Sequence, residues 1–332
     1  MTTPDLLDPH AGLVHAVETS LLPAPDREIE VLGKVPDGAD RASAVAHLQR
    51  AATEVRRRAI QTVGAVGAGH IGGEFSITDT LVTLYLGVMN ISPEQVAAGD
   101  PERDRLVLSK GHAANALYTA LAVGGYIHPE ALRTFLQPES MLNGHPARNK
   151  IAAVEANTGP LGHGLPIAVG MALAGKLDGS PRRTFVLLGD GELQEGSNWE
   201  AMMTASHQGL DRLVALVDRN RLQQGARVAD TNDLEPLADK LRAFGWEVVE
   251  VDGHDHGALL DVFAGVPAAS GKPTFVIAHT DKGYPVSYMR DNVAWHHKVP
   301  NAEQVATALT ELDAILETIP GAVPAGVGKD AS

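Results

Sequence analysis

The sequence predicts an α/β protein in which a doubly wound parallel β-sheet carries helices on both faces. Short apolar runs of strand length alternate with longer segments whose apolar residues recur at helical spacing. The helical segments are long enough to be crossovers between parallel strands. The chain has 332 residues, of which 44% are hydrophobic and 20% charged, so it can bury a large core.

The first predicted helix spans residues 44–63, where apolar residues recur at helical spacing. It contains the run Arg56, Arg57 and Arg58, which we expect on a solvated or interface face, the usual place of charge runs. The predicted strands are 105–108, 184–188, 213–217, 247–251 and 274–278. The predicted helices that accompany them are 113–123, 165–177, 198–208, 235–244 and 258–263, and a last helix follows at 302–317.

These elements suggest one large domain with an extension at each end. Residues 1–43 are rich in proline and acidic residues, and we expect an extension that wraps on the surface or is partly disordered. The domain itself spans residues 44–300. Residues 301–332 are expected to form a C-terminal helix and a tail of linker composition.

The charge and the cysteine count exclude several classes of protein. Lys and Arg number 27 against 41 Asp and Glu, a formal net charge of −14, which argues against nucleic acid as a partner. The absence of cysteine excludes disulfides, thiolate zinc sites and cysteine nucleophiles. No basic segment followed by an apolar run opens the sequence, and no apolar run approaches membrane-spanning length. We therefore expect a cytoplasmic protein with no membrane partner.

Two loops that follow predicted strands carry residues suited to a cation. The loop after 184–188 reads GDGELQEGSNWE and places Asp190 between Gly189 and Gly191. The next strand is followed by Asn220, and adjacent parallel strands should bring Asp190 and Asn220 side by side. A carboxylate, an amide oxygen and a nearby backbone carbonyl suit Mg²⁺ or Ca²⁺, completed by diphosphate oxygens and water. A GDG turn alone is equally compatible with a plain tight connection.

A second glycine pattern matches a dinucleotide-binding motif only by spacing. Residues 67–72 read GAGHIG and fit the dinucleotide-binding pattern G-x-G-x-x-G. That motif needs a strand before it and a helix that begins at once. Here a predicted helix precedes it, so we expect no nicotinamide site.

GDG followed by Asn at this spacing resembles the thiamine-diphosphate motif of thiamine-dependent enzymes. The surrounding sequence resembles the N-terminal half of transketolases. The resemblance is strongest to the N-terminal subunit of the split, two-chain members of that family. The resemblance runs from about residue 44 to residue 300. It rests on SKGHAANALY, NGHPARNK, TGPLGHGLPIAVGMALA, FGWEVVEVDGHD and DNVAWHHKVP.

This resemblance implies roles for individual residues. It implies catalytic roles for His70, His112, His145 and His296. It implies that the cofactor is bound by His112, Gly159, Pro160, Leu161, Gly189, Asp190, Gly191, Glu192, Glu195, Asn220 and His296. It implies that the metal is held by Asp190, Asn220 and Leu222. Any single histidine is more often structural than functional, and we expect His254 to be structural. Glu195 either pairs across a dimer interface, as the resemblance implies, or is an acid at a helix N-terminus.

The sequence also departs from the family pattern. Ile71 and Glu74 stand where proline and a small residue are usual, and Asp281, Tyr284 and Pro285 replace basic residues or glycine. We expect Glu74 and the changes at 281–285 to alter charge and shape near the substrate channel. They put the ordinary sugar-phosphate substrates in doubt.

The resemblance implies a transferase that moves a two-carbon ketol unit from a ketose donor to an aldehyde acceptor with thiamine diphosphate. It also implies that the chain is incomplete alone. The partner would be a C-terminal transketolase subunit with the pyrimidine-binding domain, in a heterotetramer of two plus two chains, acting on a sugar or sugar phosphate. The alternatives are the alpha subunit of a 2-oxo-acid dehydrogenase, a specialised transketolase-like enzyme, or a non-catalytic subunit. A zinc hydrolase is disfavoured, because no HExxH-like or compact ligand spacing appears.

Overall fold

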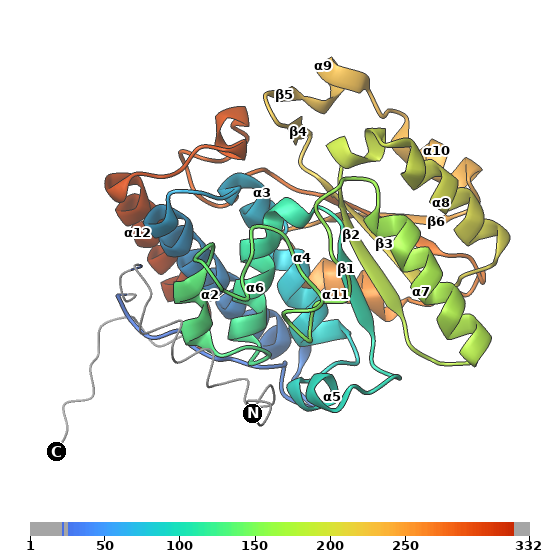
Figure 1. The fold of residues 1–332 in the computed structure, drawn as a ribbon, viewed down its shortest axis with the longest axis horizontal. Coiled ribbons are helices and arrows are strands. Elements are labelled where there is room, and N and C mark those ends of the chain that lie inside the picture. Colours follow the sequence, from blue (N-terminus) through green and yellow to red (C-terminus); the bar gives the residue numbers. More distant parts are fainter. Residues whose placement is uncertain (1–21, 23–25, 322–332) are drawn as a thin grey trace, which may run out of the picture.

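The computed structural model, which describes Leu22 and residues 26–321, confirms the predicted parallel sheet. Its five strands are all parallel and lie in the order β1-β2-β3-β7-β6 (Figure 1). Each begins at the predicted residue and ends within two residues of the predicted end. The strands are β1 (Arg105–Leu108), β2 (Thr184–Gly189), β3 (Leu213–Arg219), β6 (Glu247–Asp252) and β7 (Thr274–His279).

Helices cover both faces of the sheet (Figure 1). One side carries α7 (Gly164–Asp178), α8 (Gly196–His207) and α10 (Leu237–Ala243). The other carries α2 (Arg41–Val66), α4 (Thr78–Val82), α6 (Ala114–Val123) and α11 (His256–Ala264). Because strand side chains alternate, Phe185 and Leu187 join the second layer's core while Val186 and Leu188 join the first. The last helix, α12 (Ala302–Thr318), packs on α2.

Shorter elements, which the sequence did not predict, connect these layers. They are α3 (Ile71–Ser76), a π-helical stretch (Thr83–Val88), α5 (Pro93–Ala98), α9 (Val228–Asn232), the hairpin of β4 (Leu222–Gln223) and β5 (Ala226–Arg227), and 3₁₀ turns at Gly111–Ala113, Pro129–Thr134, Gly191–Gln194 and Val293–His296. A helix, α2, precedes the glycines at 67–72, so that segment lacks the strand that a dinucleotide motif requires.

The N-terminal segment is described only from residue 26, apart from Leu22. Its backbone bonds to the body of the domain: the Leu32 amide donates to Val123 O at 2.9 Å and the Val35 amide to Leu86 O at 2.8 Å. Helix α2 begins at Arg41, three residues before the predicted start, because the Asp40 side chain caps it by accepting from the Ser43 amide at 2.7 Å. The rest of the predicted extension, and the tail after residue 321, lie outside the described residues.

The prediction that Arg56, Arg57 and Arg58 form a solvated or interface face is wrong. Each is only 4% exposed. Arg56 makes two hydrogen bonds to Asp79, at 2.8 and 2.5 Å. Arg57 pairs with Asp313 of α12, and Arg58 donates to the Arg27 carbonyl at 2.5 Å. Three consecutive helical residues point in different directions, and here each direction is covered by another segment that supplies an acceptor.

The parallel register places the carboxyl ends of four strands together. Gly189 of β2 lies beside Asp218 of β3, and Arg219 of β3 beside His279 of β7. The residues that follow these ends therefore meet at one edge of the sheet, where ligands bind in open parallel sheets. Within the part of the chain that the structure describes, no helix is long and apolar enough to cross a membrane.

Candidate active site

A cavity of about 420 Å³ lies at the carboxyl ends of β1, β2, β3 and β7. It gathers every residue predicted to be catalytic, cofactor-binding or metal-ligating except Pro160, which is outside the lining. The lining consists of His70, Lys110, His112, His145, Gly159, Leu161, Gly189, Asp190, Gly191, Glu192, Gln194, Glu195, Asn220, Leu222, Gln223, Gln224, Lys282, His296 and His297.

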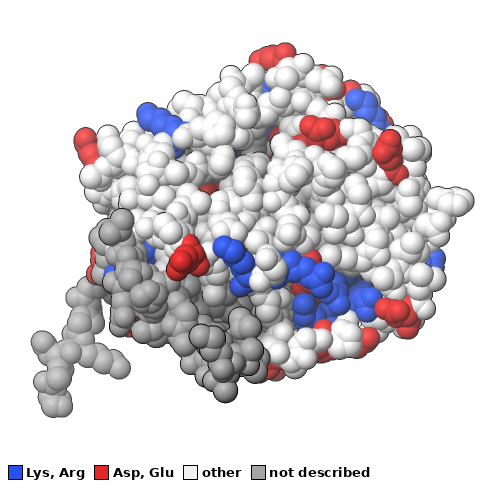
Figure 2. Space-filling view, in the orientation of Figure 1, with Lys and Arg blue, Asp and Glu red and all other residues white. Residues whose placement is uncertain are grey.

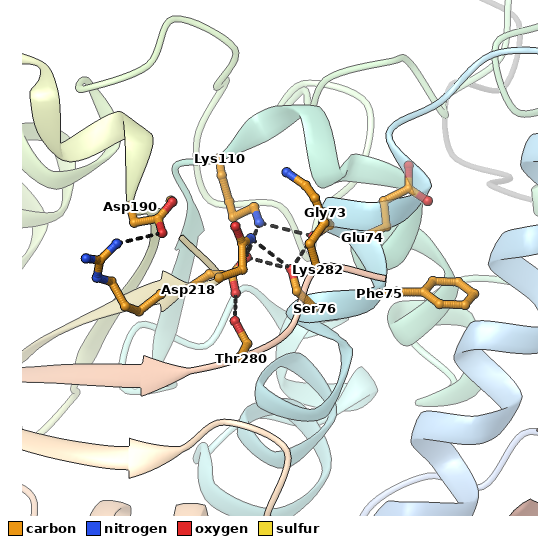
Figure 3. Close-up of polar contacts among 12 residues, drawn as sticks. Gly73, Glu74, Phe75, Ser76, Lys110, Asp190, Asp218, Thr280 and Lys282 are labelled. Carbon is orange, nitrogen blue, oxygen red and sulfur yellow. Dashed lines mark hydrogen bonds and ion pairs between the residues drawn. The ribbon is translucent and has the colours of Figure 1, made fainter. Parts of the chain in front are cut away.

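Asp190 follows β2 directly and is 2% exposed. Its Oδ1 accepts from the Gly191 amide at 2.8 Å, and its Oδ2 accepts from the Arg221 amide at 2.5 Å and from the Arg219 guanidinium at 3.2 Å (Figure 3). Burial, followed by the neighbouring Asp218 charge, raises the pKa of Asp190 above its ordinary value. A cation bound to this carboxylate would relieve that cost of ionisation.

Asn220 is held in place by a buried polar network around Asp218 (Figure 3). Asn220 Nδ2 donates to Asp218 Oδ2 at 2.9 Å, which leaves its amide oxygen to accept from the Leu222 amide at 3.0 Å. Asp218 also accepts from Ser76 at 2.7 Å, from Thr280 and from Lys110. Burial opposes ionisation of Asp218, but the Lys110 ammonium and these hydrogen bonds lower its pKa below the ordinary value. The network therefore fixes which atom Asn220 turns toward Leu222.

The oxygen atoms at this edge suit a hard divalent cation. Asp190, Asn220 and Leu222 all line the cavity, and together they offer a carboxylate, an amide and a carbonyl oxygen. The neighbouring Gln223 side-chain oxygen is buried and lacks any hydrogen-bond partner in the described structure. An unsatisfied buried acceptor beside three further oxygens fits the predicted metal site.

Three of the four predicted catalytic histidines face one another. The ring centroids of His70 and His112 are 5.2 Å apart, and those of His112 and His296 are 5.4 Å apart. Burial, reinforced by nearby imidazole and ammonium groups, lowers the pKa of His70 to about 4 and also lowers the pKa values of His112 and His296. These imidazoles are therefore neutral near pH 7, able to donate from one ring nitrogen and accept at the other.

The fourth predicted histidine lies against a glycine. His145 is exposed, and a Cβ on Gly159 would come within 3.2 Å of its ring. Gly159 also has φ +148°, a conformation that side chains rarely adopt. Both features explain why glycine occupies this position in the wall of the cavity.

Two predicted acidic residues behave differently. Glu192 is buried, and its carboxylate accepts from the Gly162 and Gly189 amides, each at 2.9 Å, and from Ser109. It ties together the loops that surround the cavity. Glu195 is exposed, precedes α8 and accepts no capping hydrogen bond from it.

Three cavity residues with ionisable side chains, Lys110, Lys282 and His297, were not predicted from the sequence. Lys110 and Lys282 are both buried, and Lys282 Nζ lies 3.2 Å from the Leu222 carbonyl and 2.9 Å from His296 Nδ1. Burial lowers the pKa of Lys282 to about 8. The lysines follow β1 and β7, so the rule that identified Asp190 also applies to them. His297, the third, adjoins a predicted residue but sits on no strand end.

Glu74, Asp281, Tyr284 and Pro285, which depart from the family pattern, do not line the cavity, although Lys282 within the same segment does. Their effect on the substrate channel stays a prediction. Glu74 is 1% exposed, does not line the cavity, and points away from the Asp218 network (Figure 3). It accepts from the His70 amide at 3.1 Å and from Asn115 at 2.9 Å. Tyr284 and Pro285 line a separate cavity of about 210 Å³.

His254 belongs to that second region and has structural partners, as predicted. Its Nδ1 lies 2.8 Å from Asp79, and its Nε2 accepts from the Asp281 amide at 2.9 Å. Tyr284 stacks on its ring with centroids 3.8 Å apart. Both ring nitrogens are occupied, so the ring is fixed.

Comparisons with known proteins agree with this geometry. A family model described as transketolase, thiamine diphosphate binding domain, matches residues 47–314. The chain is 43% identical over 266 residues to an apulose-4-phosphate transketolase subunit of Actinobacillus succinogenes, a match that covers 80% of this chain and 95% of that protein. It is 41% identical over 266 residues to the 6-deoxy-6-sulfo-D-fructose transketolase subunit SqwG of a Clostridium species. That match covers 80% of this chain and 96% of the Clostridium protein.

Solved structures give the same family. The transketolase of Pichia stipitis, in complex with sedoheptulose-7-phosphate, superimposes with a TM-score of 0.74 at 28% identity. The match covers 82% of this chain and 41% of that one, so the chain spans less than half the length of this transketolase of known structure. The chain therefore belongs to the transketolase family and corresponds to its thiamine-diphosphate-binding domain, the part that stands as a separate polypeptide in split members of the family.

Proposed function

We propose that the chain supplies the diphosphate- and cation-binding half of a two-chain transketolase. The observation that carries the proposal is the convergence of Asp190, Asn220 and Leu222 with four histidines in one cavity. Two relatives that are named as transketolase subunits, and that this chain matches over 95% and 96% of their length, support the two-chain organisation. The reaction is the transfer of a two-carbon ketol unit from a ketose to an aldehyde.

The cation, Mg²⁺ or Ca²⁺, would be held by the oxygens of Asp190, Asn220 and Leu222, and Gln223, which lines the same cavity, offers a further oxygen. Thiamine diphosphate supplies the electron sink for cleaving and forming the carbon–carbon bond. The buried ammonium groups of Lys110 and Lys282 give the cavity the positive charge that a diphosphate requires. They offset the net negative charge of the chain locally.

The histidines would handle the substrate and its protons. His70, His112 and His296 are neutral near pH 7 because burial lowers their pKa values, so each can accept a hydrogen bond from a hydroxyl at one ring nitrogen and donate one from the other. Exposed His145, across the cavity beside Gly159, is placed to hydrogen-bond a sugar hydroxyl. Glu192 would keep the surrounding loops rigid.

The partner would be a C-terminal transketolase subunit that carries the pyrimidine-binding domain, in a heterotetramer of two plus two chains. Exposed apolar side chains support such contacts: Leu161 before α7, Ile167 and Leu177 on α7, and Met203 on α8 are 36–79% exposed. Figure 2 shows that charged side chains are sparse over this face. Glu195, exposed beside it, would lie at the contact.

The substrate would be a sugar or a sugar phosphate of a specialised pathway. This follows from two relatives whose names specify apulose 4-phosphate and 6-deoxy-6-sulfo-D-fructose, both sugars with an anionic group. A cytoplasmic location, expected from the sequence, is part of the same proposal.

The test is co-expression with a candidate C-terminal partner, followed by an assay of ketol transfer from a panel of ketoses and ketose phosphates. Activity should require thiamine diphosphate and Mg²⁺. The Asp190→Asn variant should lose at least about 100-fold, since a metal ligand matters at least as much as the groups that orient it. Asp230→Asn, an exposed acid on α9, is the matched control and should retain activity.

Two outcomes would overturn the proposal. One is full activity of Asp190→Asn. The other is decarboxylation of pyruvate with transfer to a lipoyl acceptor and no ketol transfer, which would assign the complex to the 2-oxo-acid dehydrogenases.

A further inference from the structure

Three histidines at the cavity lie close enough to share one metal ion. They are His70, His296 and His297, and one ring nitrogen from each lies within 4.8 Å of the others. The ring centroids of His70 and His297 are 4.8 Å apart, those of His296 and His297 are 4.5 Å apart, and those of His70 and His296 are 5.7 Å apart. The sequence hides this cluster because His70 is distant from the other two along the chain.

The fold holds the two segments against each other. A Cβ on Gly72 would lie 2.6 Å from the Trp295 carbonyl oxygen, so the start of α3 touches the turn that carries His296. The Gly283 amide also donates to the Gly72 carbonyl at 2.9 Å. Trp295 is buried under this contact. The imidazoles are therefore brought together by packing and do not depend on a ligand.

The chemistry of the cluster differs from that of the oxygen site. Imidazole nitrogens suit zinc and other transition ions, whereas Mg²⁺ and Ca²⁺ prefer oxygen ligands. His70 and His296 are only partly exposed, so their ring nitrogens are held in place by the surrounding side chains. His297 is exposed, which leaves one side of the cluster open to solvent.

We propose that His70, His296 and His297 form a binding site for one transition-metal ion, with Zn²⁺ as the reference ligand and at least one coordination position open. Tetrahedral zinc with Zn–N bonds of about 2.0 Å needs ligand nitrogens about 3.3 Å apart. The ring nitrogens, which lie within 4.8 Å of one another, must therefore close by up to about 1.5 Å, a small movement for an exposed side chain such as His297. The ammonium groups of Lys110 and Lys282 in the same cavity repel a cation, so the site binds zinc more weakly than a structural zinc site does.

Zinc at this position would share the cavity with the substrate. It would exclude a ligand that uses His70 or His296, and so inhibit whatever reaction the cavity performs. This inference rests on the histidine geometry alone and is tested without an activity assay.

The test is titration of the purified full chain with Co²⁺, which replaces zinc and shows ligand-field absorption when nitrogen donors bind it. One equivalent should bind per chain, Zn²⁺ should displace it, and a large excess of Mg²⁺ should not. His297→Ala should weaken binding by at least about tenfold, because losing a ligand costs at least as much as losing a group that orients one. Thermal melting checks that each variant is folded.

His145→Ala is the matched control, since it removes a histidine from the same cavity but outside the cluster. It should leave the cobalt spectrum unchanged. His296→Ala should reproduce the loss seen with His297→Ala. Failure of the wild-type chain to bind one equivalent would overturn the proposal, as would displacement by Mg²⁺. Equal binding by wild type and His297→Ala would also overturn it.

Discussion

Two regions of the domain combine buried charges with histidines and line cavities, and they differ in how completely their carboxylates and histidines are hydrogen-bonded. The open cavity, at the strand ends, is lined by Asp190, two lysines and the clustered histidines. The closed cluster, which we define as Arg56 of α2, Asp79 of α4, His254 and His256, has both nitrogens of each histidine bonded and lines the second cavity. Both are built from the same residue types, so composition does not distinguish them.

The difference lies in how the carboxylates and the histidine ring nitrogens are satisfied. In the closed cluster Arg56 pairs with both oxygens of Asp79, and His254 and His256 contact the same carboxylate at 2.8 and 3.3 Å. The other ring nitrogen of each is also bonded, to the Asp281 amide and to Thr83. Burial opposes ionisation of Asp79, but Arg56 and both histidines hold its pKa well below the ordinary value.

The open cavity has the opposite character. Gln223 has a buried oxygen without a partner, the pKa of Asp190 is raised, and the histidine pKa values are lowered. Such groups destabilise the folded chain when no ligand is bound, and binding a ligand relieves that cost in free energy. Completed hydrogen bonds thus mark structural histidines, and uncompensated burial marks the candidate site.

The largest expected effect comes from breaking the closed cluster. Arg56→Ala leaves the Asp79 carboxylate buried without its main partner, and should lower the free energy of unfolding by about 3–5 kcal/mol. Denaturation in urea measures it. Arg242→Ala is the matched control, because its pair with Asp239 is exposed on both sides and should contribute less than about 1 kcal/mol. Equal effects of the two substitutions would contradict the distinction between closed and open regions.

A smaller effect is expected at Glu74, a buried carboxyl with no cationic partner. Burial raises its pKa from 4.5 to about 7. The folded chain therefore binds the Glu74 carboxyl proton more tightly than the unfolded chain does. As the pH rises from about 4.5 to about 7, ionisation of Glu74 lowers the free energy of unfolding. The shift corresponds to about 3 kcal/mol.

The measurement is urea unfolding of wild type and Glu74→Gln at about pH 5 and about pH 8. The free energy of unfolding of Glu74→Gln, relative to that of wild type, should rise by about 3 kcal/mol between about pH 5 and about pH 8. Glu303→Gln, at an exposed position on α12, should give no such gain. A pH-independent difference at Glu74 would mean that the carboxyl ionises normally.

The smallest effect should follow from disturbing the contact that holds α3 against the turn that carries His296. Gly72→Ala forces a Cβ against the Trp295 carbonyl and should cost about 1–3 kcal/mol. Gly170→Ala, on α7, meets nothing within 4 Å and should instead stabilise by up to about 1 kcal/mol, the helix propensity difference. Thermal unfolding of both variants compares them, and opposite signs are expected.

Much of the open region could be predicted from the sequence, and almost none of the closed cluster. Strands such as β2 and β3 are continuous apolar runs, and the topology of parallel sheets places Asp190 and Asn220 together once those runs are recognised. Arg56, by contrast, finds its partner Asp79 through tertiary packing, which no local pattern reports. Burial of Glu74 and convergence of His297 on His70 likewise depend on contacts between distant segments.

The decisive measurement is calorimetric titration of thiamine diphosphate into the chain assembled with its C-terminal partner, with and without Mg²⁺. The cavity formed by Asp190, Asn220 and Leu222 predicts binding that requires Mg²⁺ in the wild-type complex. The Asp190→Asn complex should bind thiamine diphosphate weakly, whether or not Mg²⁺ is present. The Asp230→Asn complex should keep tight, Mg²⁺-dependent binding. Undiminished, Mg²⁺-dependent binding by Asp190→Asn would show that the cation and its cofactor are held elsewhere.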